Sequence, residues 1–142
     1  MSRIFPFTEA TSIAFKSMVI LSSSQRPLSI RNISLMINAN PHHVGKILQR
    51  LARRNLVYSK PGSKGGFLLN KSIHRITLFE IYESVEGSGR LDYLKDLKEK
   101  DGVFRPIDFL SVEISNHFIS FLKSHNLSMY VANKLQATTQ AQ

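Results

Sequence analysis

The sequence predicts a mainly α-helical fold with a small β-hairpin, namely a winged helix-turn-helix followed by a long C-terminal helix. Three observations predict it. Two short helical patterns meet at the polar turn 38–40, two β-like runs enclose the glycine-rich turn 59–66, and the longest apolar helical pattern begins at Pro106. Two helices joined by a short turn are typical of a helix-turn-helix, and a hairpin directly after them is typical of a wing.

The two helices of the helix-turn-helix are predicted from their caps and their apolar spacing. Ser29 is a good N-cap for the first helix, whose apolar stripe is expected to comprise Ile30, Ile33, Leu35 and Met36. Asn40 can cap the second helix, and Pro41 suits its first position, where a missing N–H costs nothing. The second helix has one apolar face, formed by Val44, Ile47, Leu48 and Leu51. Its other face is basic.

Helical patterns also precede and follow this unit. Thr8 is expected to cap a helix that runs to about Ser22. Thr77 is expected to cap a further helix as a capping box with Glu80, and Gly87 stops that helix. We therefore expect a winged helix-turn-helix domain over 1–87, a flexible loop over 88–105, a dimerisation helix with a short C-terminal helix over 106–136, and a disordered tail over 137–142.

The helix that begins at Pro106 is apolar on more than one side, so it needs two burial partners. One partner is its own domain, and the other is most simply a second copy of the chain. The apolar stripe expected at the contact between the two subunits consists of Ile107, Leu110, Ile114, Phe118, Phe121 and Leu122.

The positive charge is concentrated in the first half of the chain. The net charge of the 142 residues is +9, but residues 1–76 carry 12 Lys or Arg and a single acid, Glu9, whereas residues 77–142 carry 7 Lys or Arg and 9 acids. An excess of this size on one side indicates a polyanionic partner, most simply double-stranded DNA. An anionic membrane surface fits less well, because it favours a basic amphipathic helix with a broad apolar face.

Membrane insertion and secretion have no support in the sequence. No apolar run reaches the ~18 residues that a membrane-spanning helix needs. The N-terminus also lacks the charged, apolar and small-residue regions of a signal peptide. We therefore expect a cytoplasmic protein.

Candidate DNA contacts lie on the second helix of the helix-turn-helix and on the wing. Lys46 lies in the middle of the helix and is the best candidate to read a base, whereas Arg53 and Arg54 lie where the helix leaves the groove and are assigned to phosphates. The other expected contacts from this helix and the wing are Asn40, His42, His43, Arg50, Lys60 and Lys64.

Metal binding, cofactors and catalysis are not expected. The chain has no cysteine, which excludes disulfides, thiolate zinc sites and cysteine-ligated iron–sulfur clusters. His42 and His43 are adjacent, whereas two metal ligands on one helix usually lie at i and i+4. There is no Cys nucleophile, no G-x-S-x-G and no Walker motif, and the basic half holds one carboxylate, so we expect that the protein is not an enzyme.

The chain resembles the Rrf2 family of bacterial winged-helix transcriptional regulators. The resemblance rests on LQRLARRNLV (Leu48 to Val57), KPGSKGGFLL (Lys60 to Leu69) and ITLFEIYESVEG (Ile76 to Gly87), which follow the family pattern in order and spacing. It implies a homodimer held by the long C-terminal helix, with recognition helices in adjacent major grooves and wings in or near the minor groove. By position, the resemblance adds three DNA contacts: Ser29, Arg31 and Ser63.

One departure from the family concerns the segment between Gly87 and Arg105. Many members carry three cysteines there, and these hold an iron–sulfur cluster. This segment has no cysteine and no histidine, so cluster sensing is not carried over. If a small-molecule effector is sensed, we expect it at this segment and its pocket with the long helix.

The sequence therefore predicts a homodimeric, sequence-specific DNA-binding transcriptional regulator that acts on an inverted repeat, because a two-fold dimer imposes that symmetry. Two alternatives stay open. One is a winged-helix protein-interaction module, against which the net charge of +11 in residues 1–76 argues. The other is a non-specific nucleoid-type DNA binder, which differs only in lacking sequence preference.

Overall fold

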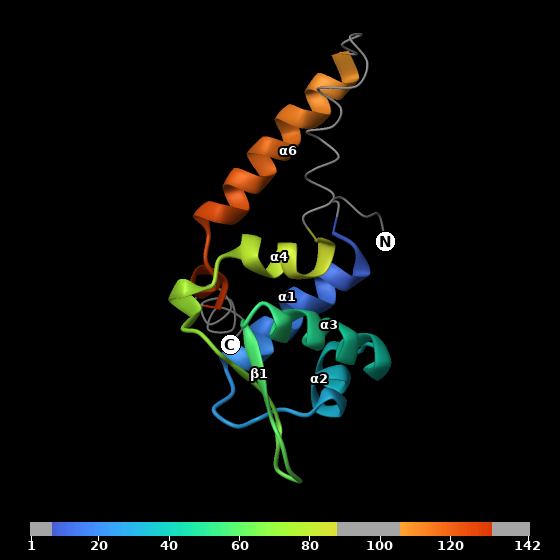
Figure 1. Cartoon of the computed structure of the whole chain (residues 1–142), viewed down its shortest axis with the longest axis vertical. Coiled ribbons are helices and arrows are strands. Elements are labelled where there is room, and N and C mark those ends of the chain that lie inside the picture. The colour runs from blue at the N-terminus through green and yellow to red at the C-terminus, as the bar shows by residue number, and fades with distance from the viewer. Residues whose placement is uncertain (1–6, 88–105, 132–142) are drawn as a thin grey trace, which may run out of the picture.

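The structure, a computed structural model, describes residues 7–87 and 106–131, and it is mainly helical with one β-hairpin, as predicted (Figure 1). The elements in chain order are α1 (Glu9–Ser22), α2 (Ile30–Ile37), α3 (Pro41–Arg53), β1 (Val57–Lys60), β2 (Gly66–Leu69), the 3₁₀ turn η1 (Ile73–Arg75), α4 (Leu78–Glu86) and α6 (Pro106–Ser124). A further helical segment covers 127–131, within the expected terminal helix. The expected flexible loop 88–105 and tail 137–142 lie outside the described residues.

Helix α1 is the central element of the fold. It packs against α2, α3, α4 and β2. One side of α1 is apolar and faces the core, where the side chains of Ile13, Ala14, Met18 and Leu21 are at most 4% exposed. Thr8 caps the helix as predicted, since its hydroxyl oxygen accepts a hydrogen bond from the Thr11 N–H at 3.2 Å. Helix α1 therefore holds the helix-turn-helix and α4 around one shared core.

A carboxylate joins the end of α4 to the beginning of α1. The hydroxyls of Thr8 and Thr11 both donate to Oε1 of Glu86, at 2.6 Å and 2.5 Å. Thr11 is fully buried, and its hydroxyl is satisfied by Glu86 and by the Thr8 hydroxyl, which lies 3.1 Å away. A negative charge beside the N-terminus of α1 is also favoured by the helix dipole. The chain then leaves α4 at Gly87 in a positive-φ conformation, as expected for a helix stop.

The helix-turn-helix has the predicted caps, but its first helix buries fewer apolar residues than predicted. Ser29 caps α2, and Ile33 is fully buried. The prediction that Leu35 and Met36 belong to the buried stripe is wrong, because these side chains are 73% and 63% exposed. Helix α2 has only eight residues, and Ile33 and Ser34 occupy its buried side.

Helices α2 and α3 pack closely at Gly45 of α3, where an added Cβ would lie 3.3 Å from Cδ1 of Ile30 in α2.

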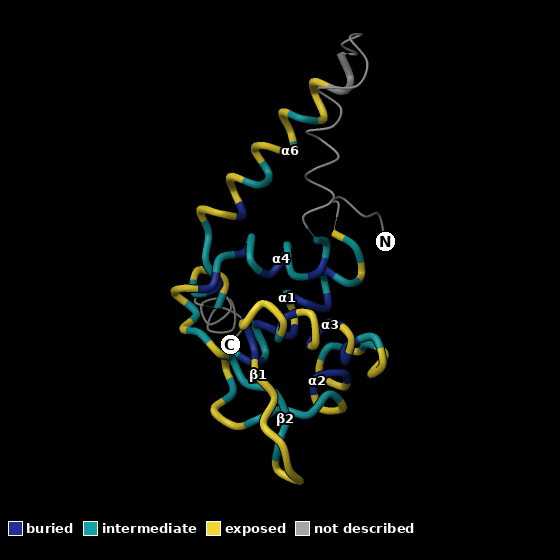
Figure 2. The backbone as a smooth tube through the Cα atoms, in the orientation of Figure 1, coloured by how far each residue is buried: buried dark blue, intermediate teal, exposed yellow. Residues whose placement is uncertain are grey.

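The hairpin is the predicted wing, and it is fastened to the segment that precedes α2. Its strands are antiparallel, with Val57 opposite Leu69 and Lys60 opposite Gly66. Leu28 forms a further antiparallel bridge: its N–H donates to the Phe67 carbonyl at 3.1 Å, and the Phe67 N–H donates to the Leu28 carbonyl at 2.8 Å. The hairpin tip projects from the molecule as an exposed segment (Figure 2).

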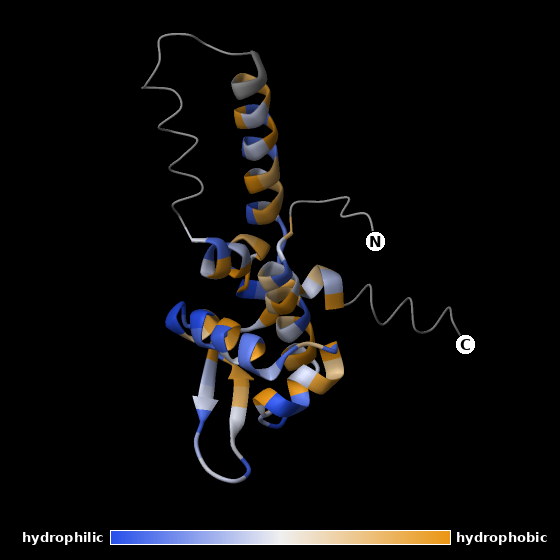
Figure 3. Ribbon diagram, turned by 90° about the vertical axis from the view of Figure 1, so that its right-hand side faces the viewer, coloured by the Kyte–Doolittle hydropathy of each residue, from blue (hydrophilic) through white to orange (hydrophobic). Residues whose placement is uncertain are grey.

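Helix α6 is anchored at one end and projects at the other. The Leu78 N–H donates to the His125 carbonyl and the Leu127 N–H to the Ile76 carbonyl, each at 2.9 Å, so the end of α6 lies beside the start of α4. From there the helix extends away from the other elements as alternating hydrophobic and hydrophilic turns (Figure 3). Leu122, expected at the subunit contact, is instead 2% exposed within its own subunit, because it lies on the side of α6 that faces this anchor.

Gly66→Ala should destabilise the protein more than Gly62→Ala. Both glycines have positive φ, 147° and 106°, and a non-glycine residue there costs about 1–3 kcal/mol. At Gly66 the added Cβ would also lie 2.5 Å from the carbonyl carbon and oxygen of Leu28, whereas at Gly62 it would meet nothing within 4 Å. Thermal unfolding followed by circular dichroism measures the difference. An equal loss of Tm in both variants would show that close packing against Leu28 does not matter.

Candidate nucleic-acid interface

The start of α2, the outer side of α3 and the hairpin lie at the same end of the molecule, away from the projecting part of α6 (Figure 1). The chain has no Asp or Glu between residues 10 and 79, so this end carries cations without neighbouring acids from its own elements. Helix α3 supplies most of the candidate contacts, and its rotation about its own axis decides which of them face outward.

The burial of one face of α3 sets this rotation. Val44, Ile47, Leu48 and Leu51 are at most 2% exposed, as predicted from their spacing. The side opposite to them carries four exposed side chains that follow one line along the helix, since they are separated by four, three and four residues. We call these the outer stripe of α3: His42, Lys46, Gln49 and Arg53.

The outer stripe is free to contact a partner. Within the described part of the chain, no hydrogen bond or ion pair engages the side chains of Lys46, Gln49 or Arg53. Three members of the stripe were predicted as DNA contacts, and Gln49 was not, because its side chain carries no charge. Helical spacing alone places Gln49 between Lys46 and Arg53, so the signal for it was present.

Two predicted DNA contacts of α3 also interact with α4. Nη1 of Arg50 donates to the Val85 carbonyl at 3.1 Å, and Nη2 of Arg54 lies 3.7 Å from Oε1 of Glu83. Val85 lies in the last turn of α4, where carbonyls have no partner within the helix and attract cations. Arg50 thus contacts α4 although the residue is exposed, and its contact with DNA stays a prediction. Sequence periodicity identifies the buried face of α3 but not the flank that a neighbouring helix occupies. His43 is half-buried on the same flank.

The predicted contacts at the helix starts also serve as caps. Oδ1 of Asn40 accepts a hydrogen bond from the His42 N–H at 2.9 Å, and Oγ of Ser29 accepts one from the Asn32 N–H at 3.1 Å. Both caps leave N–H groups of the first helical turn directed away from the helix, as backbone contacts to phosphate require. Arg31, in the first turn of α2, is exposed.

The wing presents its charge at the tip. Lys60, Ser63 and Lys64 are all exposed there. The turn requires glycine at position 65 for a structural reason. An added Cβ at Gly65 would lie 2.0 Å from the Lys60 carbonyl oxygen, so the turn is too tight for a side chain there. The tight turn therefore fixes where the wing cations lie.

Helix α4 begins with an acid that is already paired. Glu80 forms the predicted capping box with Thr77 and an ion pair of 3.0 Å with Lys71. Burial raises the pKa of Glu80, but the hydrogen bond from the Thr77 N–H and the Lys71 ammonium outweigh it, so its pKa lies below the ordinary value of 4.5. Glu80 and Lys71 thus neutralise each other, and Lys71 is not part of the outer stripe or the wing.

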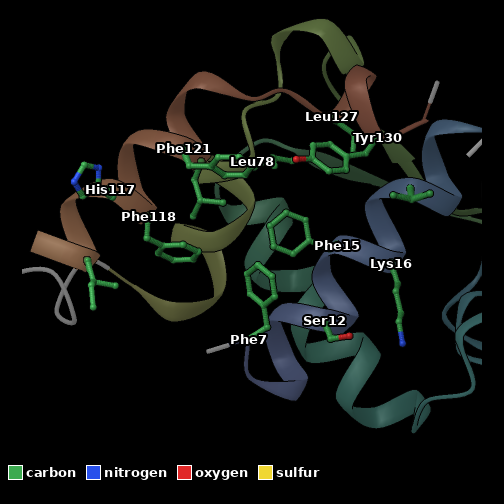
Figure 4. A pocket seen from close by; sticks show the side chains of 13 residues that line it. Phe7, Ser12, Phe15, Lys16, Leu78, His117, Phe118, Phe121, Leu127 and Tyr130 are labelled. Atoms are coloured by element: carbon green, nitrogen blue, oxygen red, sulfur yellow. The ribbon is translucent and has the colours of Figure 1, made fainter. Parts of the chain in front are cut away.

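A second candidate site is the apolar groove between α1 and α6 (Figure 4). Its volume is about 840 Å³. Phe7 packs on Phe15 and Phe118, with ring centroids 5.5 Å and 6.1 Å apart, and Phe118 meets the ring of Tyr82 edge-on at 5.3 Å. Ser12, Lys16, His117 and Tyr130 add the polar groups of the lining. The segment 88–105, at which an effector pocket was expected, lies outside the described residues.

In residues 7–87 and 106–131, no three His, Asp or Glu side chains come together as metal ligands do, and the chain has no cysteine. No helix within these two ranges combines the length and the hydropathy that a bilayer crossing requires.

Solved structures with the same fold include transcriptional regulators. The structure matches CymR (YrzC), the global cysteine regulator of B. subtilis, with a TM-score of 0.72 and 19% identity over 92% of this chain and 98% of that chain. It matches IscR of T. potens with a TM-score of 0.75 and 17% identity over 100% of this chain and 94% of that chain. At these identities the likeness establishes the fold.

Sequence comparison gives two relatives and a family. YwgB of Bacillus subtilis (strain 168), named as an HTH-type transcriptional regulator, is 37% identical over 67 residues, which are 47% of this chain and 43% of YwgB. YffB of Lactococcus lactis subsp. lactis (strain IL1403), named likewise, is 33% identical over 66 residues, or 46% and 42%. The match spans less than half the length of these relatives. The family model of Rrf2, described as an iron-dependent transcriptional regulator, matches residues 7–133. The chain therefore belongs to the Rrf2 family of transcriptional regulators.

Proposed function

We propose that this protein is a sequence-specific DNA-binding regulator that acts in the cytoplasm as a homodimer on an inverted-repeat operator, and that it is not an enzyme. The outer stripe of α3 is the observation that carries the proposal. It presents Lys46 and Arg53 on a helix narrow enough to enter the major groove, while the opposite face of the helix is buried. Arg31, Lys60 and Lys64 lie at the same end and would contact phosphates beside the groove.

The proposed regulator has no cysteine-ligated iron–sulfur cluster. The family description names iron, but such clusters require thiolates and this chain contains none. Histidines and carboxylates do not replace them in the described residues, where no cluster of three such groups occurs. The donor set therefore does not fit a cysteine-ligated cluster, and no step of the proposed function depends on one.

The second copy of the chain would cover the exposed apolar side of α6 and the groove beside it. Leu110, Ile114 and Phe121 are 49%, 60% and 49% exposed and lie along one side of the helix. Exposed apolar residues that continue into an apolar groove of this size are typical of a subunit interface. Phe118 belongs to the same region but packs on its own subunit, and the side chain of Ile107 lies outside the described residues.

The function is tested by selecting source-genome fragments on the purified protein at near-physiological salt and sequencing those retained. We expect a short inverted repeat, because a two-fold dimer presents two α3 helices to two half-sites. Uniform retention that fades steeply with salt would instead indicate a nucleoid-type binder. Failure to retain DNA would favour the protein-interaction module. A Lys46→Glu/Arg53→Glu variant with unchanged Tm is the control, and it should lose the enrichment.

Arg50→Ala should affect mainly the stability of the protein, whereas Arg53→Ala should affect mainly DNA binding. Arg50→Ala removes the hydrogen bond to the Val85 carbonyl and should lower the free energy of unfolding by about 1 kcal/mol. Arg53→Ala should leave the stability within about 0.5 kcal/mol of wild type but reduce the slope of log K against log salt by about one. Thermal melts and salt titrations of DNA binding measure both. If Arg50→Ala lowers the salt slope and leaves Tm unchanged, Arg50 contacts a phosphate rather than α4.

Ile114→Asp should convert the dimer into a folded monomer. The side chain is 60% exposed in the single subunit, so a carboxylate there is tolerated by the monomer but would be buried without a partner in the dimer. Asn116→Asp adds the same charge at an exposed position on another side of α6 and should remain dimeric. Size-exclusion chromatography with light scattering gives the masses. A dimeric Ile114→Asp variant would remove this side of α6 from the interface.

A further inference from the structure

The outer stripe of α3 contains a neutral amide between two cations. Lys46 lies three residues before Gln49 and Arg53 four residues after it, so each is a neighbour of Gln49 on the helix surface. All three are exposed. If Lys46 and Arg53 approach the DNA, Gln49 must approach it as well, because the same line on the helix carries all three.

The amide of Gln49 also has no partner among residues 7–87 and 106–131. No described residue donates to it or accepts from it. The neutral polar side chains Ser29 and Asn40, at the starts of α2 and α3, already accept hydrogen bonds from their own helices. Gln49 is the only amide side chain within α3 itself. When Gln49 enters the groove, its amide loses hydrogen bonds to water and must form new ones with the DNA. A donor or acceptor of the amide that finds no partner there weakens binding.

We propose that Gln49 reads an adenine in the major groove of each operator half-site. The inference rests on the proposed DNA-binding function and adds to it the base that this helix recognises. The side-chain amide offers an acceptor and a donor side by side, which matches N6–H₂ and N7 of adenine, whereas guanine presents two acceptors on the same edge. The lysine and arginine beside it match guanine or phosphate but not adenine. Gln49 therefore supplies a base preference that the cations of the stripe cannot.

The alternative is that Gln49 is an ordinary solvent-exposed helix residue. Glutamine favours helices and is common on their exposed surfaces, so exposure alone does not distinguish the two roles. The roles differ in what happens to sequence preference when the amide is removed. Removing the amide of a merely solvent-exposed residue changes neither the preferred DNA sequence nor the affinity. Removing the amide of a base-reading residue changes the preference at one position of each half-site.

The experiment is a selection from randomised duplex DNA with the full-length wild type, Gln49→Ala, Gln49→Arg and the control Gln25→Ala, whose side chain is exposed outside the helix-turn-helix. We expect the wild type and Gln25→Ala to prefer adenine at one position of each half-site by roughly tenfold. Gln49→Ala should lose the preference at that position alone, with an unchanged salt slope. Gln49→Arg should replace adenine by guanine there. Equal Tm values verify that the variants are folded.

Two other results would overturn the inference and are distinguishable from each other. If Gln49→Ala selects the same inverted repeat as wild type, with every position unchanged, the regulator function stands and Gln49 does not read a base. If the wild type itself retains DNA without any preferred sequence, no residue of α3 reads a base, and the sequence-specific function fails together with this inference.

Discussion

The burial of one face of α3 is the constraint on which the proposed function depends. Val44, Leu48 and Leu51 have no exposed surface, so the helix cannot rotate about its axis without exposing core side chains. Burying each such side chain is worth roughly 1.5–3 kcal/mol, far more than any single surface contact of α3 contributes. The core thus determines the line of side chains that faces outward, and it does so without regard to what that line binds.

The neighbouring helix α4 divides the remaining surface of α3 into two parts. The guanidinium of Arg50 is engaged by the Val85 carbonyl, and Arg54 lies near Glu83, so the cations on this flank hold the two helices together. Arg53, which differs from them only by its place on the helix, has no described partner. The end of α4 is in turn fixed to α1 through Glu86 and the two threonine hydroxyls. The position of the outer stripe therefore depends on polar contacts as well as on the core.

The two proposed binding surfaces lie at opposite ends of the subunit. The outer stripe and the wing are at one end, and the projecting part of α6 is at the other (Figure 1). Helix α6 is fixed to the start of α4 by the backbone hydrogen bonds of Leu78 and Leu127. Because α4 also contacts α3 through Arg50 and Arg54, α4 connects the two ends of the subunit. A second subunit on α6 would set the distance between two α3 helices, and this distance determines the spacing of the operator half-sites.

Local patterns predicted most of the fold, because caps and apolar spacing involve neighbouring residues. The caps at Thr8, Ser29, Asn40 and Thr77 all form, and the hairpin and the long helix lie where expected. The departures involve long-range contacts. Periodicity could not assign Arg50 to α4 or Leu122 to the core, since both depend on which element packs alongside. The bond between Thr11 and Glu86 joins residues 75 positions apart and leaves no local signal.

The central claim is that α3 enters the major groove of DNA. Hydroxyl-radical footprinting with guanine N7 methylation interference, on a DNA fragment that the protein retains, tests it most directly. We predict two protected segments on one face of the duplex, about one helical turn apart, with interference from methyl groups in the major groove of each. Protection spread evenly along the fragment, without interference at N7, would contradict the claim, because it would mean that the basic end of the protein contacts only the DNA backbone.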